Sequence, residues 1–108
     1  MSPTIAELMA KMPIAFLPER AAGMEAVVQF HFTGAETGEW SATIKEGKCM
    51  VGRGVSPSPN LTLTADSGDF LKIFSGEKDG MQAFMQGRLG FTGDTNLALK
   101  LLSVFEID

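Results

Sequence analysis

Apolar and polar side chains alternate along much of the chain between residues 27 and 65, and this period of two residues most constrains the fold. The alternation runs through residues 27–32, 38–45 and 61–65, while residues 48–53 follow a Glu46-Gly47 pair that suits a tight turn. Successive side chains of a strand point to opposite faces of a sheet, so each stretch predicts a strand with one buried face. We therefore predict an antiparallel meander with a single apolar layer.

The spacing of apolar residues changes in the second half of the chain. In segments 66–76, 79–86 and 94–105 they recur at helical spacing, which predicts three helices. Residues 88–92 return to alternation and predict a fifth strand. The order of elements predicts an α+β domain in which a late strand rejoins the sheet.

Residues at the segment ends predict where the helices begin and end. Ser2 followed by Pro3 is typical of a helix start, and we expect the first helix to stop near Pro13. Asp66 and Asp94 are expected to cap later helices, because an aspartate side chain can accept hydrogen bonds from free backbone amides.

The chain is the length of one domain, and its composition argues against several kinds of partner. Its 108 residues carry a net charge of −4, so we predict no nucleic-acid partner. No apolar run approaches the roughly 20 residues of a transmembrane helix, and residues 1–12 lack the apolar core of a signal peptide. We expect one domain over residues 1–108, located in the cytoplasm.

Few residues could perform catalysis or hold a metal. His31 and Cys49 are the sole histidine and the sole cysteine, which excludes an internal disulfide and a histidine- or thiolate-rich metal site within one chain. His31 falls on the polar side of its strand, which predicts a solvated ring and not a partner for Cys49. The aspartates at helix starts are explained by capping. We predict no catalytic residue, no metal and no cofactor.

The segment GRLGFTGD, residues 87–94, raises the question of a phosphate loop. Its evenly spaced glycines match neither the dinucleotide fingerprint nor the Walker loop. An anion at the following helix start would also meet the negative charge of Asp94. We predict structural roles, in which Gly87 ends one helix and Gly93 turns the chain into the next.

The last predicted helix is apolar over more of its circumference than packing on a sheet requires. Between residues 97 and 105, only Lys100 and Ser103 are polar. A helix that covers a sheet needs an apolar stripe of about 100°. The remaining surface could meet another helix, a partner chain or an apolar ligand, and the pattern favours none of the three.

Several motifs occur in a fixed order along the chain. They are Gly38 with Trp40, Leu61 to Thr64 ahead of Asp66, Phe74 to Gly76, Met85 to Leu89 with Gly93-Asp94, and the apolar run from Leu97 to Phe105. This ordered set resembles the sterol carrier protein two family of lipid-binding domains, and the resemblance runs over nearly the whole chain.

The resemblance implies a five-stranded, mostly antiparallel sheet with helices packed over one face, enclosing an apolar tunnel. It implies a non-catalytic carrier that holds a fatty acid, fatty acyl-CoA, sterol or quinone-like ligand. The residues that match the tunnel lining are Phe70, Ile73, Phe74, Met81, Phe84, Met85, Phe91, Leu101, Leu102 and Phe105. Phe and Met suit such a lining because they are apolar and, in the case of Met, adaptable in shape.

The resemblance leaves several properties open. Some members end in a Ser-Lys-Leu-like peroxisomal signal, whereas this chain ends in FEID, and we expect a cytoplasmic protein, monomeric or homodimeric, with transient membrane contact allowed. The alternative function is an association module that uses the apolar surface of the last helix to bind a second chain. An enzyme ranks third, because His31 and Cys49 offer little to build a site from.

Overall fold

The computed structural model describes residues 4–106, and within them it leaves out the side chains of Leu99 and Leu102. The elements are, in chain order, α1 (Ile5–Ala15), η1 (Pro18–Arg20), β1 (Ala26–Thr33), β2 (Gly38–Lys45), β3 (Lys48–Arg53), β4 (Leu61–Asp66), α2 (Ser67–Phe74), α3 (Gly80–Met85), β5 (Leu89–Gly93), α4 (Thr95–Leu101) and η2 (Leu102–Val104). The predicted α+β class is confirmed.

The strands form one sheet in the order β3-β2-β1-β4-β5. β1–β2, β2–β3 and β4–β5 are antiparallel, whereas β1 and β4 run parallel with Phe30 opposite Leu63. The predicted meander was therefore wrong for β4, which lies beside β1 and not beside β3. The loop over residues 54–60 carries the chain to that position, and Asn60 Oδ1 accepts a hydrogen bond from Val27 N at 2.8 Å.

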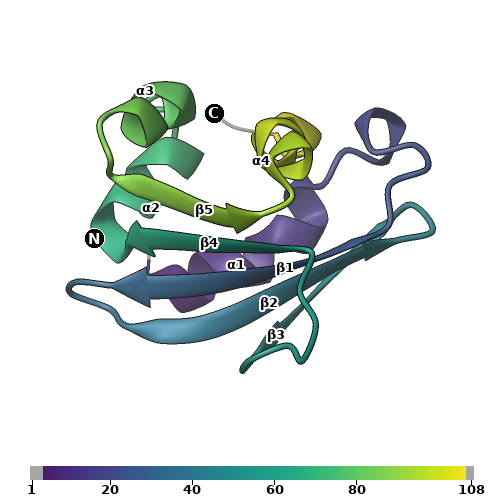
Figure 1. The fold of residues 1–108 in the computed structure, drawn as a ribbon, viewed down its shortest axis with the longest axis horizontal. Helices are drawn as coiled ribbons and strands as arrows, with labels where there is room; N and C mark the ends of the chain where they lie inside the picture. The colour runs from purple at the N-terminus through teal and green to yellow at the C-terminus, as the bar shows by residue number, and fades with distance from the viewer. Residues whose placement is uncertain (1–3, 107–108) are drawn as a thin grey trace.

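The helices cover one face of the sheet, as predicted. Across the strands, Val28 lies opposite both Ala42 and Leu61, and Leu63 lies opposite Phe91. All except the half-buried Phe91 are buried, and they face the same side. Figure 1 shows α3 and α4 beside the β5 edge, with β3 at the opposite edge of the sheet.

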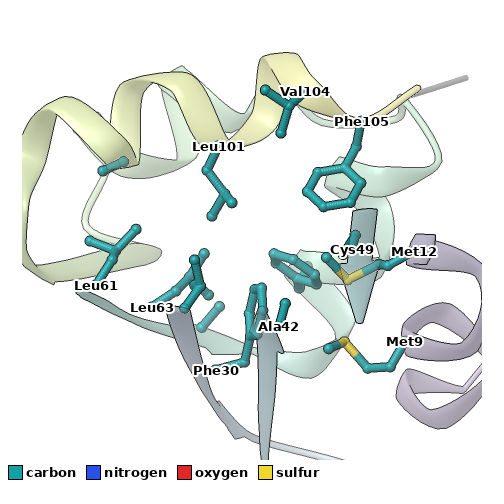
Figure 2. Packing of buried hydrophobic residues seen from close by; sticks show 14 of the residues in the cluster. Met9, Met12, Phe30, Ala42, Cys49, Leu61, Leu63, Leu101, Val104 and Phe105 are labelled. Atoms are coloured by element: carbon teal, nitrogen blue, oxygen red, sulfur yellow. The ribbon is translucent and has the colours of Figure 1, made fainter. Parts of the chain in front are cut away.

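The core lies between this face and the helices. Figure 2 shows Leu101 of α4, Val104 of η2 and the following Phe105 pointing toward the sheet, where Phe30 and Leu63 point back at them. All five side chains are almost fully buried. Met9 and Met12 of α1 close the core at the side near Cys49.

The first helix begins at Ile5 and ends later than the sequence indicates. Thr4 is its N-cap, because the Thr4 hydroxyl accepts a hydrogen bond from Glu7 N at 3.1 Å. The predicted start at Ser2 and Pro3 lies outside the described residues. The helix also continues through Pro13 to Ala15, since a proline in the last turn removes only one helical hydrogen bond there.

The last helix is shorter than predicted. α4 ends at Leu101, η2 ends at Val104, and Phe105 is extended and forms an isolated antiparallel bridge with Phe16. Leu17 N donates to Val104 O at 2.7 Å, and Glu106 N donates to Ala15 O at 2.8 Å. These hydrogen bonds between distant segments replace the helical hydrogen bonds that the sequence pattern predicts for residues 102–105. The spacing of apolar residues in this segment does not indicate them.

Candidate functional site

A cavity of about 800 Å³ lies between the end of α2, the helix α3, the strand β5 and the helix α4. Its lining is mostly apolar and consists of Ile73, Gly76, Lys78, Asp79, Gly80, Met81, Phe84, Phe91, Thr95, Ala98 and Ser103. Each wall comes from a different element, so the cavity exists only when β5 has returned to the sheet and α4 has packed beside it.

Aspartate caps fix two of these walls. Asp79 Oδ1 accepts a hydrogen bond from Met81 N at 2.8 Å and starts α3. Asp94 Oδ1 accepts from Asn96 N at 3.0 Å and from Leu97 N at 3.2 Å and starts α4. Each carboxylate satisfies amides that have no partner within the helix. The prediction of capping at Asp94 is confirmed.

Phe84 and Phe91 form an aromatic pair in the cavity wall, with 5.4 Å between their ring centroids. Phe84 is 45% exposed and Met81 is 50% exposed, although both line the cavity. The cavity is therefore an open groove on this side of the molecule. The structure of residues 4–106 does not show the enclosed tunnel that the family resemblance implies.

Charged side chains lie in the groove lining and next to it. Lys78, which lines it, donates a hydrogen bond from Nζ to Asp69 Oδ1 at 2.7 Å, and Arg88 Nη1 lies 3.4 Å from the same oxygen. The hydrogen bond from Lys78 lowers the pKa of Asp69 below its ordinary value of 3.8, although burial acts in the opposite direction. These contacts tie the α2–α3 connection to the start of β5.

Four of the ten predicted lining residues reach the groove, namely Ile73, Met81, Phe84 and Phe91. Phe70, Phe74 and Phe105 form instead a chain of aromatic contacts in the core, with centroids 5.5 Å apart for the first pair and 5.7 Å for the second. The sequence pattern placed all of them on apolar helix faces, but only the packing decides which face meets the groove.

The other three predicted lining residues differ in position. Leu101 is buried and points toward the sheet. Met85 is 78% exposed and stands outside the groove lining. The side chain of Leu102 lies outside the described part of the chain.

Sequence reasoning missed several residues of the lining. Besides the connection residues around α3, these include Thr95, Ala98 and Ser103 on the α4–η2 segment. A small or polar residue every three to five positions in an otherwise apolar helix was the available signal. Small side chains there leave room that larger ones would fill.

A second cavity, of about 510 Å³, lies on the other side of α4. Its lining is mixed in charge and includes Arg20, Glu25, Asp94 and Lys100. Ser103 lines both cavities, so the apolar groove and this polar cavity approach each other at η2.

His31 and Cys49 lie on opposite faces of the sheet. His31 contacts Glu39 on the face without helices. Cys49 is buried on the helix-covered face, and burial raises the pKa of its thiol to about 11. A thiol with that pKa is not nucleophilic at neutral pH. Among residues 4–106, no group of three or more His, Cys, Asp or Glu side chains is placed to hold a metal ion.

A family model described as the SCP-2 sterol transfer family matches residues 6–106. The chain belongs to this family. Solved SCP-2 domains share the fold. The crystal structure of sterol carrier protein 2 like 2 from Aedes aegypti superposes with a TM-score of 0.75 at 28% identity, covering 94% of this chain and 92% of that one. The solution structure of palmitated SCP2L2 from the same organism gives 0.72 at 29% identity, covering 93% and 88%.

Curated relatives are longer proteins. Hydroxysteroid dehydrogenase-like protein 2 of Xenopus tropicalis is 42% identical over 78 residues, which are 71% of this chain and 19% of that protein. Peroxisomal multifunctional enzyme A of Dictyostelium discoideum is 37% identical over 70 residues, 63% of this chain and 16% of the relative. The SCP-2 domain described here thus spans about a fifth of the length of the relatives it matches.

No helix among residues 4–106 of this SCP-2 domain combines the length and the apolar character needed to cross a bilayer.

Proposed function

We propose that residues 1–108 act as one non-catalytic domain that holds the apolar part of a lipid in the groove between α2, α3, β5 and α4. The observation that carries the proposal is the mostly apolar cavity of about 800 Å³. This volume lies within the range of about 300–1,000 Å³ that small-molecule sites occupy. Met81, Phe84 and Phe91 can repack around chains of different shape.

Palmitate is the first ligand to test. A structure of a related sterol carrier domain with 29% identity is described as palmitated. A fatty acid, its acyl-CoA ester, a sterol or a quinone would each place an apolar body in the groove, and Lys78 in the lining offers a positive charge to a polar group of the ligand.

The names of the curated relatives do not argue for catalysis by this domain. They belong to proteins about four times as long as this chain, and the match covers about a fifth of their length or less. In the described residues, the buried Cys49 and the His31 on the opposite face offer no nucleophile with a base. We propose that any dehydrogenase activity of such proteins resides elsewhere in them.

The cytoplasm remains the proposed location. One relative carries the word peroxisomal in its name, which describes that protein. A fusion of this chain to a fluorescent protein, imaged in the native cell, would test the location directly.

The decisive experiment is native mass spectrometry of the freshly purified chain, followed by lipid extraction and titration with palmitate, palmitoyl-CoA, cholesterol and ubiquinone. We expect bound lipid, and a rise of the melting temperature that grows with ligand concentration, because a ligand that binds only the folded state stabilises it. No bound mass and no rise with any of the four would overturn the proposal.

Two variants locate the site. Thr95 lines the groove and is exposed, so Thr95→Trp should fill the groove without disturbing the core, and palmitate affinity should fall at least tenfold. His31→Ala is the matched control on the helix-free face and should bind palmitate as the unmodified chain does. Equal affinity in Thr95→Trp would place the ligand outside this groove.

The association module stays the second candidate function. The exposed apolar residues of α3 favour this function, because clustered exposed apolar side chains are typical of protein-binding surfaces. A stable dimer in light scattering, together with no lipid uptake, would support this alternative over the carrier.

A further inference from the structure

The helix α3 concentrates the exposed apolar surface of the described chain. Among residues 4–106, six large hydrophobic side chains are exposed, and three of them, Met81, Phe84 and Met85, belong to this helix of six residues. Isolated exposed hydrophobic residues are ordinary, whereas a cluster marks a surface that meets something apolar. We call these three residues the α3 patch.

The helix α3 is attached to the fold by its caps, by Ala83 and by one member of the α3 patch, Phe84, which pairs with Phe91 at 5.4 Å. Ala83 is the buried residue of α3, and Arg88 N donates a hydrogen bond to Ala83 O at 2.8 Å. Asp79 caps the helix start. These contacts hold the helix, yet roughly half or more of each residue of the α3 patch stays exposed.

The α3 patch is continuous with the groove. Met81 and Phe84 belong both to the patch and to the groove lining, and Met85 extends the patch beyond the rim. Whatever surface the patch contacts therefore lies at the mouth of the groove. A lipid that enters or leaves at this mouth would pass directly between the groove and that surface.

We propose that the α3 patch inserts shallowly into the surface of a zwitterionic phospholipid bilayer and holds the groove mouth against it. The proposal rests on the lipid-binding function proposed above only for its purpose. Its evidence is the exposure of the α3 patch. The occupant is the bilayer, where a water-insoluble ligand resides, and not a second copy of the chain.

The area of the α3 patch argues against a second copy. A Met or Phe side chain presents roughly 200 Å², so exposures of 50%, 45% and 78% leave on the order of 350 Å² of apolar surface. A stable protein interface buries about 800 Å² on each partner. The patch covers less than half of that area, but shallow insertion of a few apolar side chains needs no more.

The charges around α3 indicate the kind of bilayer. Residues 69–88 contain Asp69, Glu77 and Asp79 against Lys72, Lys78 and Arg88, so this segment is neutral while the whole chain carries −4. A neutral surface gains nothing from anionic lipids, and the chain as a whole is repelled by them. Binding is therefore driven by apolar contact and depends little on salt.

The test is flotation of the full chain with phosphatidylcholine vesicles at 0.05 M and 0.5 M salt. We expect similar binding at both salt concentrations. Met85 stands outside the groove lining, so Met85→Gln should lower the fraction bound about tenfold and leave palmitate affinity in solution unchanged. Ile14→Gln is the matched control, because Ile14 is 84% exposed and belongs to α1.

Several results would overturn the inference. They are no flotation of the unmodified chain, equal flotation of Met85→Gln, or an equal loss in Ile14→Gln. Binding only to phosphatidylglycerol vesicles, abolished by 0.5 M salt, would show that electrostatic attraction and not apolar insertion drives binding. A dimer in sedimentation that Met85→Gln dissociates would assign the α3 patch to a second copy. Flotation without palmitate binding would support the docking surface and overturn the carrier function alone.

Discussion

Glu36 in the turn between β1 and β2 caps the first helix from outside, through a hydrogen bond of 2.7 Å from Ile5 N to Glu36 Oε1. Its second carboxylate oxygen accepts from Ala6 N at 3.2 Å, and its own backbone N–H donates to the Oγ of Ser67 at 3.1 Å. Ser67 is buried at the start of α2. One turn residue thus holds the starts of two helices at the same end of the sheet.

Replacing Glu36 should destabilise the fold without touching the groove. Glu36→Ala removes the acceptor for two helical amides and should lower the free energy of unfolding by about 1–2 kcal/mol, as losses of helix caps do. Urea unfolding measures this change. Glu19→Ala, at an exposed position of η1, is the control, and equal losses in the two variants would contradict the capping role.

Phe105 should matter for stability more than for the ligand. Its ring lies 5.7 Å from Phe16 and 5.7 Å from Phe74 in the core. Phe105→Ala should cost about 3–5 kcal/mol of unfolding free energy, as large-to-small core substitutions do. Palmitate binding should then fall only in proportion to the folded fraction. A lower affinity of the fully folded variant would instead place Phe105 at the ligand.

The backbone conformation and the close neighbours at position 93 require glycine. Its φ is +114°, and a Cβ there would lie 2.5 Å from the backbone oxygen of Asn60. Gly93→Ala should therefore cost about 2 kcal/mol or more in urea unfolding. At Gly52, an added Cβ would meet no atom within 4 Å, so Gly52→Ala should stay close to the unmodified chain. Similar losses at both glycines would contradict this explanation.

The ion pair between Asp69 and Lys78 should make the stability of the fold depend on pH in the acid range. Its pKa is lowered in the folded state, chiefly by the hydrogen bond from Lys78, so its contribution is present above the unfolded pKa of about 3.8 and is lost as the pH falls through the folded value. Asp69→Asn should lower stability at pH 7 by up to about 1 kcal/mol. Unfolding in urea at pH 7, 4 and 2.5 should show this difference shrinking toward zero, and a constant difference would exclude the ion pair as its cause.

The sequence predicted the strands and their buried faces well, because alternation is a local property of the chain. It did not predict the burial of Gln29, which falls on the polar side of β1. In the fold, Gln29 Nε2 donates to the carbonyl oxygens of Trp40 and Gly54 at 3.0 and 3.1 Å, and its Oε1 accepts from Ser56 N at 2.7 Å. The loop after β3 passes over this face of the sheet and supplies the contacts from Gly54 and Ser56. These residues lie more than 20 positions after Gln29, so the local pattern of β1 does not indicate them.

The groove was predictable in kind but not in detail. Apolar helix faces at Ile73, Met81 and Phe84 indicated a shared apolar surface, and the structure places these residues in one lining. Phe70 and Leu101 show the same helical spacing and became core. The difference depends on how each short helix rotates against the sheet, which long-range contacts decide.

By itself, the sequence determined the α+β class, the single apolar face of the sheet and the family resemblance, because each follows from local periodicity or from motifs in order along the chain. Only the tertiary structure decided that β4 lies parallel to β1, that the last helix gives way to a bridge between Phe105 and Phe16, and that the cavity is an open groove. These features arise from contacts between segments distant in the chain, where packing and hydrogen bonding outweigh local propensity.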